Sequence, residues 1–571
     1  MMKLFESLPR SSFWFYVLAF GLALAVRLIR LDAWPLTEEE ARWAMQAFEM
    51  VQGLRPEIGA HPGYVLFTAL AFFVFQASEF TARLAPAVFG AALVIAPALF
   101  QDRLGEKPAL VLAFLLALDP GFLAISRLAG SPVLAVSALV LAWGAWRNGF
   151  IPAAGILAGL ALLGGPQIWP GLLGLAISAG LFHRFFAPGM NERPLRRAEA
   201  TRALLYTVGT ILTVGTLFLL SPGSLSGLIQ SLSAYLSGWF NFDDTLFAEP
   251  GAFVPASRLL IALGVYAFPA LLLAVITLVR GILQRDALTL GLGIWFGVAL
   301  ILALANPARQ VFDLAWPLLP LLALAALEAA RHLRPAEGNV WETASMMAFT
   351  LSLLFFVGSN FSGLALNTLT VEQTQIRLLL LLAGLVMLIV SIFLVAYGWS
   401  VPVAVQGSIW GGLVILLVWH LSTAMAAGGL RAIPTAEMWP PGLPVRYSHA
   451  LTEQLREVER WKWQPAQPLT ITVSGVESAA LRWALRDWKP DFTFAATLTE
   501  TPDVLITPVQ QESPALAESY RGQDFIWRTQ TFWDELQPTD WLRWIFRHQT
   551  TEGQEALILW VRNDLFPDSQ P

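Results

Sequence analysis

The sequence contains no cysteine in its 571 residues. This absence excludes disulfide bonds, thiolate metal sites and cysteine nucleophiles together. Charge is also scarce, because Asp, Glu, Lys and Arg make up only 13% of the chain and leave a formal net charge of −5. A net charge this small over such a length gives no reason to expect affinity for nucleic acid. The chain shows no internal repeat either, which argues against the two-halved architecture of many secondary transporters.

Apolar residues are abundant instead. They make up 56% of the sequence, with 23 Trp and 37 Phe, and the mean hydropathy is +0.59. Uninterrupted apolar runs such as residues 378–395 are near the length that crosses a bilayer core of about 30 Å. The run at 13–26 could imitate a signal peptide, but Arg27 and Arg30 follow it in place of a small-residue cleavage site. We therefore predict an all-α polytopic membrane protein whose first helix is an uncleaved anchor.

The length rule predicts about thirteen membrane spans. The apolar segment 64–75 is too short to cross a bilayer and is predicted to be an interfacial or re-entrant helix. The predicted spans lie near residues 13–31, 83–101, 109–126, 132–147, 151–165, 166–182, 203–221, 258–280, 287–305, 311–330, 344–358, 377–397 and 405–427.

Lys and Arg residues set the predicted orientation, since cytoplasmic loops carry an excess of them. Alternating the spans from a cytoplasmic N-terminus places the basic loops near residues 103–107, 184–202 and 280–285 inside. The segment 27–83 and the C-terminal tail then lie on the outer face of the cytoplasmic membrane. Several arginines remain there against the charge rule, and guanidinium groups bind phosphate through paired hydrogen bonds. A phosphate-bearing substrate at the outer leaflet would account for several members of this set: Arg27, Arg30, Arg42, Arg55, Arg83, Arg127, Arg258, Arg309 and Arg377.

The composition changes near residue 430. Residues 1–430 form the predicted membrane domain, with its first outer loop at 32–82, and residues 431–446 form a Pro-rich linker. Residues 447–571 alternate strand-like and helical patterns, which predicts a small extracytoplasmic α/β domain. We expect helices at 447–463, 477–488 and 541–547, and strands at 469–473, 504–507, 525–529 and 556–561.

The densest group of ionisable residues lies between residues 27 and 83. It includes the three carboxylates Glu38, Glu39 and Glu40, which directly follow Thr37. Charges placed beside a bilayer cost free energy unless they are paired or hydrated, which favours a functional role. A structural explanation is also open, because Thr37 can cap a helix whose first-turn acids are stabilised by the helix dipole.

Three segments of this region carry a resemblance to a known superfamily. They read RLIRLDAWPLTEEEARWA at residues 27–44, HPGYVLFTALAFFVF at 61–75 and SEFTARLAPAVFGA at 78–91. Together they resemble the GT-C superfamily of membrane glycosyltransferases that depend on polyprenyl-phosphate sugars, the group that includes the protein O-mannosyltransferases. The bacterial and archaeal branch described as flippase-activity-associated is the most similar. The resemblance is dense over the first 150 residues, sparse in the middle and moderate at the end.

The resemblance implies which residues form the site. It makes Glu39 the catalytic base or the organiser of metal and phosphate, with Glu40 supporting it. It implies that His61, Arg83, Arg127 and Arg309 contact the substrate, and it allows for a divalent cation whose identity stays unknown. For His61 a structural turn, and for Arg83 and Arg127 an anchoring role at helix ends, remain open alternatives.

Two departures from the family pattern bear on activity. The aspartate of the acidic motif is replaced by Glu39, which moves the carboxylate by one methylene; a displacement of about 1 Å can lower a rate on the order of a hundredfold. The family also carries an acid about five positions after the arginine that matches Arg127, and here that position is Pro132. Asp119 is a candidate replacement for the missing acid.

Two functions follow as leading expectations. The first is a glycosyltransferase at the outer face of the cytoplasmic membrane that moves a sugar from a polyprenyl-phosphate donor to a protein, lipid or glycan acceptor. The second is a non-catalytic relative that binds or handles lipid-linked sugars, as Pro132 would suggest. The expected partners are the lipid-linked donor, membrane lipids and an unknown acceptor, without nucleic acid. A secondary transporter ranks third, because the charges cluster at one face of the membrane instead of at its midplane.

Overall fold

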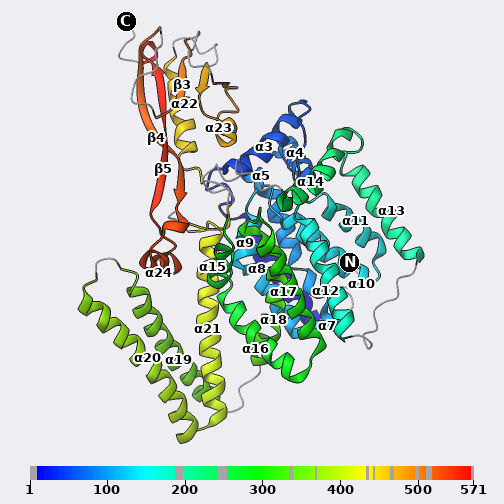
Figure 1. Cartoon of the computed structure of the whole chain (residues 1–571), viewed down its shortest axis with the longest axis vertical. Helices are drawn as coiled ribbons and strands as arrows, with labels where there is room; N and C mark the ends of the chain where they lie inside the picture. Colours follow the sequence, from blue (N-terminus) through cyan, green and yellow to red (C-terminus); the bar gives the residue numbers. More distant parts are fainter. Residues whose placement is uncertain are drawn as a thin grey trace.

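The computed structural model describes residues 10–186, 197–240, 254–333, 339–366, 369–431, 436–440, 444–462, 469–494, 501–509 and 517–566. The gaps include parts of the predicted basic loop at 184–202 and of the predicted linker at 431–446. Most of the described chain is helical, and a five-stranded sheet lies at one end of the helical bundle (Figure 1).

Four helices near the N-terminus position the candidate site: α2 (Arg10–Leu28), α3 (Glu38–Val51), α4 (Pro62–Phe75) and α5 (Glu79–Leu93). Helix α3 begins with a capping box, in which the Thr37 side chain accepts from the backbone of Glu40 while the Glu40 side chain accepts from the backbone of Thr37. Ser78 and Thr81 form a similar box at the start of α5. The structural explanation of the acids after Thr37 is therefore confirmed for the helix start.

The remaining bundle helices mostly overlap the predicted spans, except that two of them, within residues 222–240, lie between the predicted spans 203–221 and 258–280. They are α6 (Ala96–Leu99), α7 (Gln101–Leu104), α8 (Glu106–Leu118), α9 (Pro120–Ser126), α10 (Val133–Arg147), α11 (Ile151–Leu162), α12 (Ile168–Phe186), α13 (Arg197–Thr213), η1 (Pro222–Leu225), α14 (Ser226–Phe240), α15 (Ala256–Tyr266), α16 (Phe268–Gln284), α17 (Ala287–Ala305), η3 (Val311–Leu314), α18 (Ala315–His332), α19 (Val340–Gly363), α20 (Val371–Gly398) and α21 (Val401–Ala427).

The number of spans differs from the expectation. Among the described residues, six helices are long and apolar enough to cross a membrane, or eight if two bent pairs each count as one span. The two pairs are α8 with α9, bent by 52°, and α15 with α16, bent by 88°. A proline begins or closely follows the start of the second helix in each pair, at Pro120 and Pro269, where the missing N–H and the ring favour a break. The chain is thus a multi-pass membrane protein, and the count of thirteen is not confirmed.

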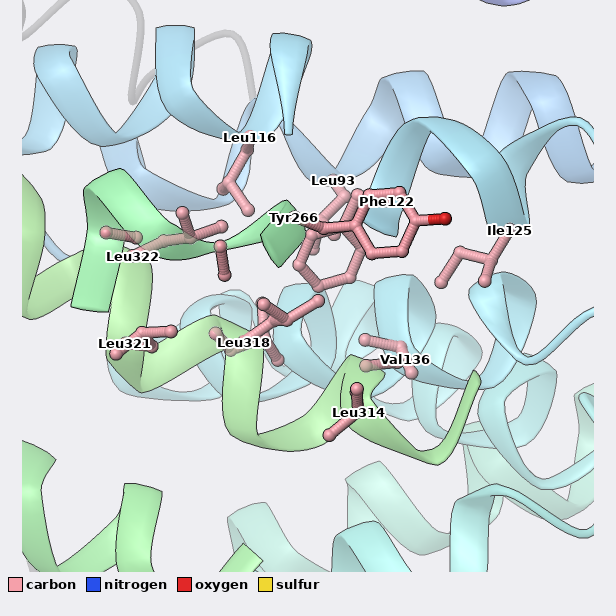
Figure 2. Packing of buried hydrophobic residues seen from close by; sticks show 14 of the residues in the cluster. Leu93, Leu116, Phe122, Ile125, Val136, Tyr266, Leu314, Leu318, Leu321 and Leu322 are labelled. Carbon is pink, nitrogen blue, oxygen red and sulfur yellow. The ribbon is translucent and has the colours of Figure 1, made fainter. Parts of the chain in front are cut away.

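The core of the bundle is formed by small and branched apolar side chains. Figure 2 shows leucines of α18 packed against Leu93, Leu116, Phe122 and Val136 of the N-terminal helices. Tyr266, at the end of α15, is 1% exposed and lies in the same cluster. Its hydroxyl oxygen points away from Leu321 and Leu322 (Figure 2). The core therefore holds one polar group at the bend between α15 and α16.

Helices α19, α20 and α21 project beside the main bundle (Figure 1). Only 6% of the apolar window of α20 is buried inside the protein. A helix with so much exposed apolar surface is stable where lipid covers it. This arrangement is consistent with a membrane location.

The C-terminal region contains α22 (Ser448–Trp461), β1 (Ile471–Ser474), α23 (Ala479–Ala484), β2 (Asp491–Thr493), β3 (Val504–Pro508), β4 (Tyr520–Thr531), η4 (Trp533–Glu535), α24 (Pro538–Arg547), β5 (Glu552–Arg562) and η5 (Asn563–Leu565). The strand order is β2-β1-β3-β5-β4, with β1 parallel to β2 and β3 and with β5 antiparallel to β3 and β4. Every predicted strand is present. The short strand β2 was not predicted, and α23 is shorter than expected.

The sheet region shares a hydrophobic cluster with the first loop of the membrane domain. Ala41, Ala44 and Ala47 of α3 belong to the same buried cluster as Leu481 and Trp483 of α23. Figure 1 shows α23 beside α3, while the long strands β4 and β5 lead to α24 near the end of α21. Two regions more than 400 residues apart in sequence are therefore packed as neighbours. The predicted domain boundaries themselves stay predictions.

Candidate functional site

A cavity of about 310 Å³ lies where the bundle, the linker and the C-terminal region meet. Its wall includes residues next to α3, the end of α21, residues 436–440 and the segment between β4 and α24. The wall is unusually rich in charge for so apolar a chain. Its arginines are Arg83, Arg127, Arg258, Arg431 and Arg446, and its carboxylates are Glu40, Glu437, Asp534, Glu535 and Glu552.

Glu40 is completely buried and accepts hydrogen bonds at both carboxylate oxygens. Arg83 donates to Oε1 through Nε and to Oε2 through Nη2, each at 2.7 Å. The backbone N–H groups of Ala129 and Thr37 complete the set, at 2.9 Å to Oε1 and 3.0 Å to Oε2. Both oxygens of this carboxylate are thus occupied by charge-assisted and backbone hydrogen bonds from within the protein. The geometry thus suits Glu40 to holding α3 against α5 and the segment after α9.

The two preceding acids have different partners. Glu38 accepts from the Ser478 hydroxyl at 2.6 Å and from the backbone of Ala480 at 3.0 Å, and it pairs with Arg528 at 2.9 Å. It therefore connects α3 to the start of α23. Glu39 is 36% exposed and lies 3.4 Å from Arg42, one turn along the same helix. Glu39 is not part of the cavity wall.

Arg83 and Arg127 both reach the cavity wall, but their donors are turned toward the protein backbone. Besides Glu40, Arg83 donates to the carbonyls of Leu31, Trp34 and Pro35 at 2.8–3.1 Å, so all of its N–H groups are used. Arg127 donates to the carbonyls of Val26, Arg27, Ile29 and Arg30 at 2.8–3.1 Å. A cation on the last carbonyls of a helix is favourable, and Arg127 supplies one to the C-terminus of α2.

The other residues predicted to bind substrate lie apart from the cavity wall. His61 precedes α4 and packs edge-on against Trp43, with ring centroids 4.7 Å apart. Burial lowers the pKa of His61 to about 4, so the ring is neutral near pH 7. Arg309 donates to the carbonyl of Val254 at 3.2 Å. Its neighbours Gln310 and Val311 line the cavity, whereas Arg309 does not.

The structure also describes Pro132, the position where the resembled superfamily carries an acid. Pro132 is the residue before α10 and offers no ionisable group. Asp119 is fully buried and caps α9 by accepting from the backbone of Phe122 at 2.8 Å. It does not line the cavity, so the structure does not bring it next to the arginines there.

Four acids of the cavity wall were missed at the sequence level: Glu437, Asp534, Glu535 and Glu552. Glu437 is the only carboxylate of residues 431–446, and its side chain is 6% exposed. The hydroxyl of Tyr266 donates to Oε2 at 2.5 Å, and Nδ1 of His548 lies 3.0 Å from Oε1. A single carboxylate inside a Pro-rich segment is the signal that could have drawn attention to Glu437.

Arg446 and Arg258, two further arginines of the cavity wall, differ in how many of their N–H groups donate hydrogen bonds to the protein. Arg446 donates through Nη2 to both oxygens of Glu552 at 3.1 Å. Arg258 pairs with Asp534 at 2.9 Å, yet its buried Nε has no hydrogen-bond partner within the described ranges. Among the arginines of the cavity wall, Arg258 has the fewest hydrogen-bond acceptors in the described chain, which suits its guanidinium to bind an anion in the cavity.

No cluster of three or more His, Asp or Glu side chains in the described part of the chain could hold a metal ion. The expectation of a divalent cation stays a prediction, and no step below depends on it.

No protein-family model and no curated protein matches the sequence. The fold, in contrast, matches solved structures over almost the whole chain. The crystal structure of ArnT from Cupriavidus metallidurans bound to undecaprenyl phosphate aligns with a TM-score of 0.53 at 13% identity, covering 97% of this chain and 99% of that one. The apo form of ArnT aligns with a TM-score of 0.51 at 14% identity, covering 95% and 97%.

The chain has the GT-C fold. This confirms, at the level of the fold, the resemblance in residues 27–91. An oligosaccharyltransferase from Archaeoglobus fulgidus in complex with zinc and sulfate also aligns, over 86% of this chain and 68% of that one at 12% identity. Its TM-score of 0.37 is too low to carry an argument. The GT-C fold accommodates different reactions, so function has to be argued from the cavity.

Proposed function

We propose that this protein is a membrane glycosyltransferase that takes a sugar from a polyprenyl-phosphate donor on the outer face of the cytoplasmic membrane. The acceptor is a hydroxyl-bearing protein, lipid or glycan. The observation that carries the proposal is the cavity of about 310 Å³ with five arginines in its wall. The fold supports it, since ArnT shares that fold over its length and was solved with undecaprenyl phosphate.

Transfer from a lipid phosphate needs a few groups in defined places. Cations must stabilise the departing phosphate, and a carboxylate must take the proton of the attacking hydroxyl. Arg258 is the arginine we assign to the phosphate, because it lines the cavity and Asp534, a 68% exposed carboxylate, is its one hydrogen-bond acceptor in the described chain. Arg83 and Arg127 shape the same wall while holding α2, α3 and α5 together.

The direct test measures binding and transfer with the full chain in lipid nanodiscs. Radiolabelled polyprenyl-phosphate sugars are added, and release of polyprenyl phosphate and labelling of native membrane acceptors are followed. We expect turnover by the wild type, and weaker undecaprenyl-phosphate binding by about tenfold or more in Arg258→Gln, the cost of one charge-assisted hydrogen bond. Arg42→Gln, which changes a 57% exposed arginine outside the cavity wall, is the control. Wild-type protein that neither binds nor transfers would refute the proposal.

The second candidate is a non-catalytic protein that binds lipid-linked sugars. Pro132 favours it, because it removes an acid that the family pattern places near the arginines. Binding of the donor without any release of polyprenyl phosphate, over the whole panel of sugars, would select this candidate.

The predicted orientation in the membrane is also testable. Because the sequence contains no cysteine, an introduced cysteine is the one thiol that a maleimide can label. Single cysteines at Asp102 and Glu518, both exposed, should react with an impermeant maleimide from opposite sides of the membrane. Labelling of Glu518→Cys in intact cells places the C-terminal region outside. Labelling of both positions from the same side would overturn the predicted topology.

A further inference from the structure

The acid of the linker segment lies in surroundings that no other carboxylate of the cavity has. Glu40 is saturated by Arg83 and two amides, and Glu552 is paired with Arg446. Asp534 is paired with Arg258 and is 68% exposed, and Glu535 is exposed as well. Glu437 alone among them is shielded from water, accepts a hydrogen bond from a hydroxyl, and has an imidazole nitrogen 3.0 Å away instead of a guanidinium pair in the described chain.

The backbone around Glu437 is fixed on both sides. The N–H of Ala436 donates to the carbonyl of His548 at 3.0 Å, and Nε1 of Trp544 donates to the carbonyl of Ala436 at 2.7 Å. On the other side, the N–H of Met438 donates to the hydroxyl oxygen of Tyr266 at 3.2 Å. The linker is thus attached to α24 before Glu437 and to the end of α15 after it.

The side chain is fixed as well. Tyr266 packs against the rings of Trp439 and Trp544, with centroids 5.6 and 5.8 Å apart, and donates to Oε2 of Glu437. His548 is 1% exposed and has a positive φ of 54°, an uncommon backbone conformation outside glycine. Such conformations persist only where the surroundings hold them and are frequent at functional sites.

One oxygen of Glu437 is left for a ligand. Oε1 is buried and has no hydrogen-bond partner in the described chain, although Nδ1 of His548 lies 3.0 Å away in unfavourable geometry. A buried carboxylate oxygen without a donor costs free energy, and a hydroxyl group entering the cavity would satisfy it. Glu437 and Arg258 line the same cavity, so this atom can meet the requirement for a proton acceptor in it.

We propose that Glu437 is the catalytic base of the transfer reaction, with Tyr266 and His548 as its positioning residues; this rests on the proposed function. The acceptor hydroxyl gives its proton to Oε1 of Glu437, and its oxygen forms a bond to the anomeric carbon of the sugar. The bond from that carbon to the phosphate oxygen breaks, and the electron pair leaves with the polyprenyl phosphate. The protonated Glu437 then releases its proton to water.

The assignment explains how the chain manages without the acid that Pro132 replaces. In this protein the base comes from the segment that joins the membrane helices to the C-terminal region. Tyr266 belongs to the former and His548 to the latter, so the base is in position only when both parts are packed together. The sequence resemblance, in contrast, places the base at Glu39, within the first outer loop alone.

The test compares single variants of the full chain in nanodiscs. General-base catalysis contributes roughly 10²–10⁴ to a rate, so Glu437→Gln should lower transfer by at least about a hundredfold. Its binding of undecaprenyl phosphate should stay within about twofold of the wild type, because the phosphate contacts are kept. Glu57→Gln, which changes an exposed acid of the first loop outside the cavity wall, should leave both values unchanged.

A second variant separates positioning from folding. Tyr266→Phe keeps the ring and removes one donor to the carboxylate, so the acid limb of the pH–rate profile should move to higher pH. His548 and Arg431, the other ionisable groups near Glu437 and Tyr266, are unchanged in this variant. A merely structural role would lower stability and leave the position of the limb where it was.

The possible results separate a failure of the base assignment from a failure of the proposed function. Transfer by Glu437→Gln within about threefold of an active wild type overturns this inference and leaves the proposed function standing. Should Glu437→Gln fail to assemble, an unmoved acid limb in Tyr266→Phe overturns it. A wild type that transfers no sugar from any donor removes the proposed function, and the assignment of a base falls with it.

Discussion

Glu40 and Glu437 line the same cavity, but their surroundings are opposite. Glu40 belongs to the segment with the strongest resemblance to known enzymes, and its two oxygens accept from a guanidinium and two backbone amides. Glu437 belongs to a linker with no motif, and one of its oxygens has no hydrogen-bond donor among the described residues. The comparison teaches that a charged motif can be used mainly to hold helices together while the reactive group comes from elsewhere in the chain.

The largest expected effect tests the structural side of this comparison. Arg83→Met leaves Glu40 as an uncompensated buried charge, which should destabilise the protein by about 3–5 kcal/mol. The double variant Arg83→Met with Glu40→Met removes both charges and should recover most of that loss. Thermal unfolding in detergent measures both. A double variant that is stable and still transfers sugar would show that Glu40 is not needed for chemistry, whereas a stable but inactive one would assign the Arg83–Glu40 pair a role in the reaction.

Arg127 gives the next effect. Arg127→Met removes a cation from four carbonyls at the end of α2 and should cost about 1.5–3 kcal/mol. The midpoint of thermal unfolding should fall accordingly, and undecaprenyl-phosphate binding by the folded fraction should change little. If binding were lost at unchanged stability, Arg127 would be a phosphate ligand as the sequence resemblance implies.

Glu38 tests the contact that brings the C-terminal region to the cavity. Glu38→Gln keeps the size of the side chain but removes the ion pair with Arg528 and weakens the cap on α23, at a cost of about 1–2 kcal/mol. Hydrogen exchange should become faster in α23, with no change in α10, which lies in the bundle. Transfer should fall as well, since the base depends on that packing. Exchange that stays unchanged in α23 would contradict the role of Glu38.

His61 gives a pH-dependent effect. Its pKa is lowered to about 4 in the folded protein from an ordinary value near 6.5, so the unfolded state binds more protons between these values. Stability is therefore fully present above about pH 6.5 and is lost as the pH falls toward 4. His61→Gln should flatten this part of the unfolding profile, measured as melting temperature against pH. A stronger pH dependence in the variant would contradict the buried, neutral state of the ring.

The smallest effect is expected at Glu39. Its partner Arg42 is 57% exposed, and exposed pairs on a helix are worth within about 0.5 kcal/mol. Glu39→Gln should therefore unfold like the wild type. Its transfer rate sharpens the comparison, because the sequence resemblance assigns the base to Glu39. A rate that falls a hundredfold, on the order expected for a lost general base, would favour Glu39 over Glu437.

Local patterns were sufficient to predict much of the fold. Apolar runs located most helices of the bundle, and Thr37 followed by three acids predicted the start of α3. The strands β3, β4 and β5 followed from their alternating or apolar segments. The bends at Pro120 and Pro269 were not anticipated, because a proline beside an apolar run is compatible with a straight, kinked or broken span.

The pairing of charged groups could not be predicted in the same way. Glu40 and Arg83 are 43 residues apart, and Glu38 and Ser478 are 440 apart, so nothing in their local sequence states that they meet. Of the three arginines predicted to bind substrate, Arg83 and Arg127 line the cavity and Arg309 does not; their binding of substrate stays a prediction. The role proposed for Glu437 depends on its contacts with Tyr266 and His548, which approach it from distant segments of the chain.

One measurement tests the central claim most directly: a structure of the protein in nanodiscs with undecaprenyl phosphate bound. The account predicts phosphate density inside the cavity, within hydrogen-bonding distance of Arg258. Glu437 is expected to face the side of the phosphate that Arg258 does not contact. Phosphate density beside Glu39 and Arg42, outside the cavity wall, would contradict it.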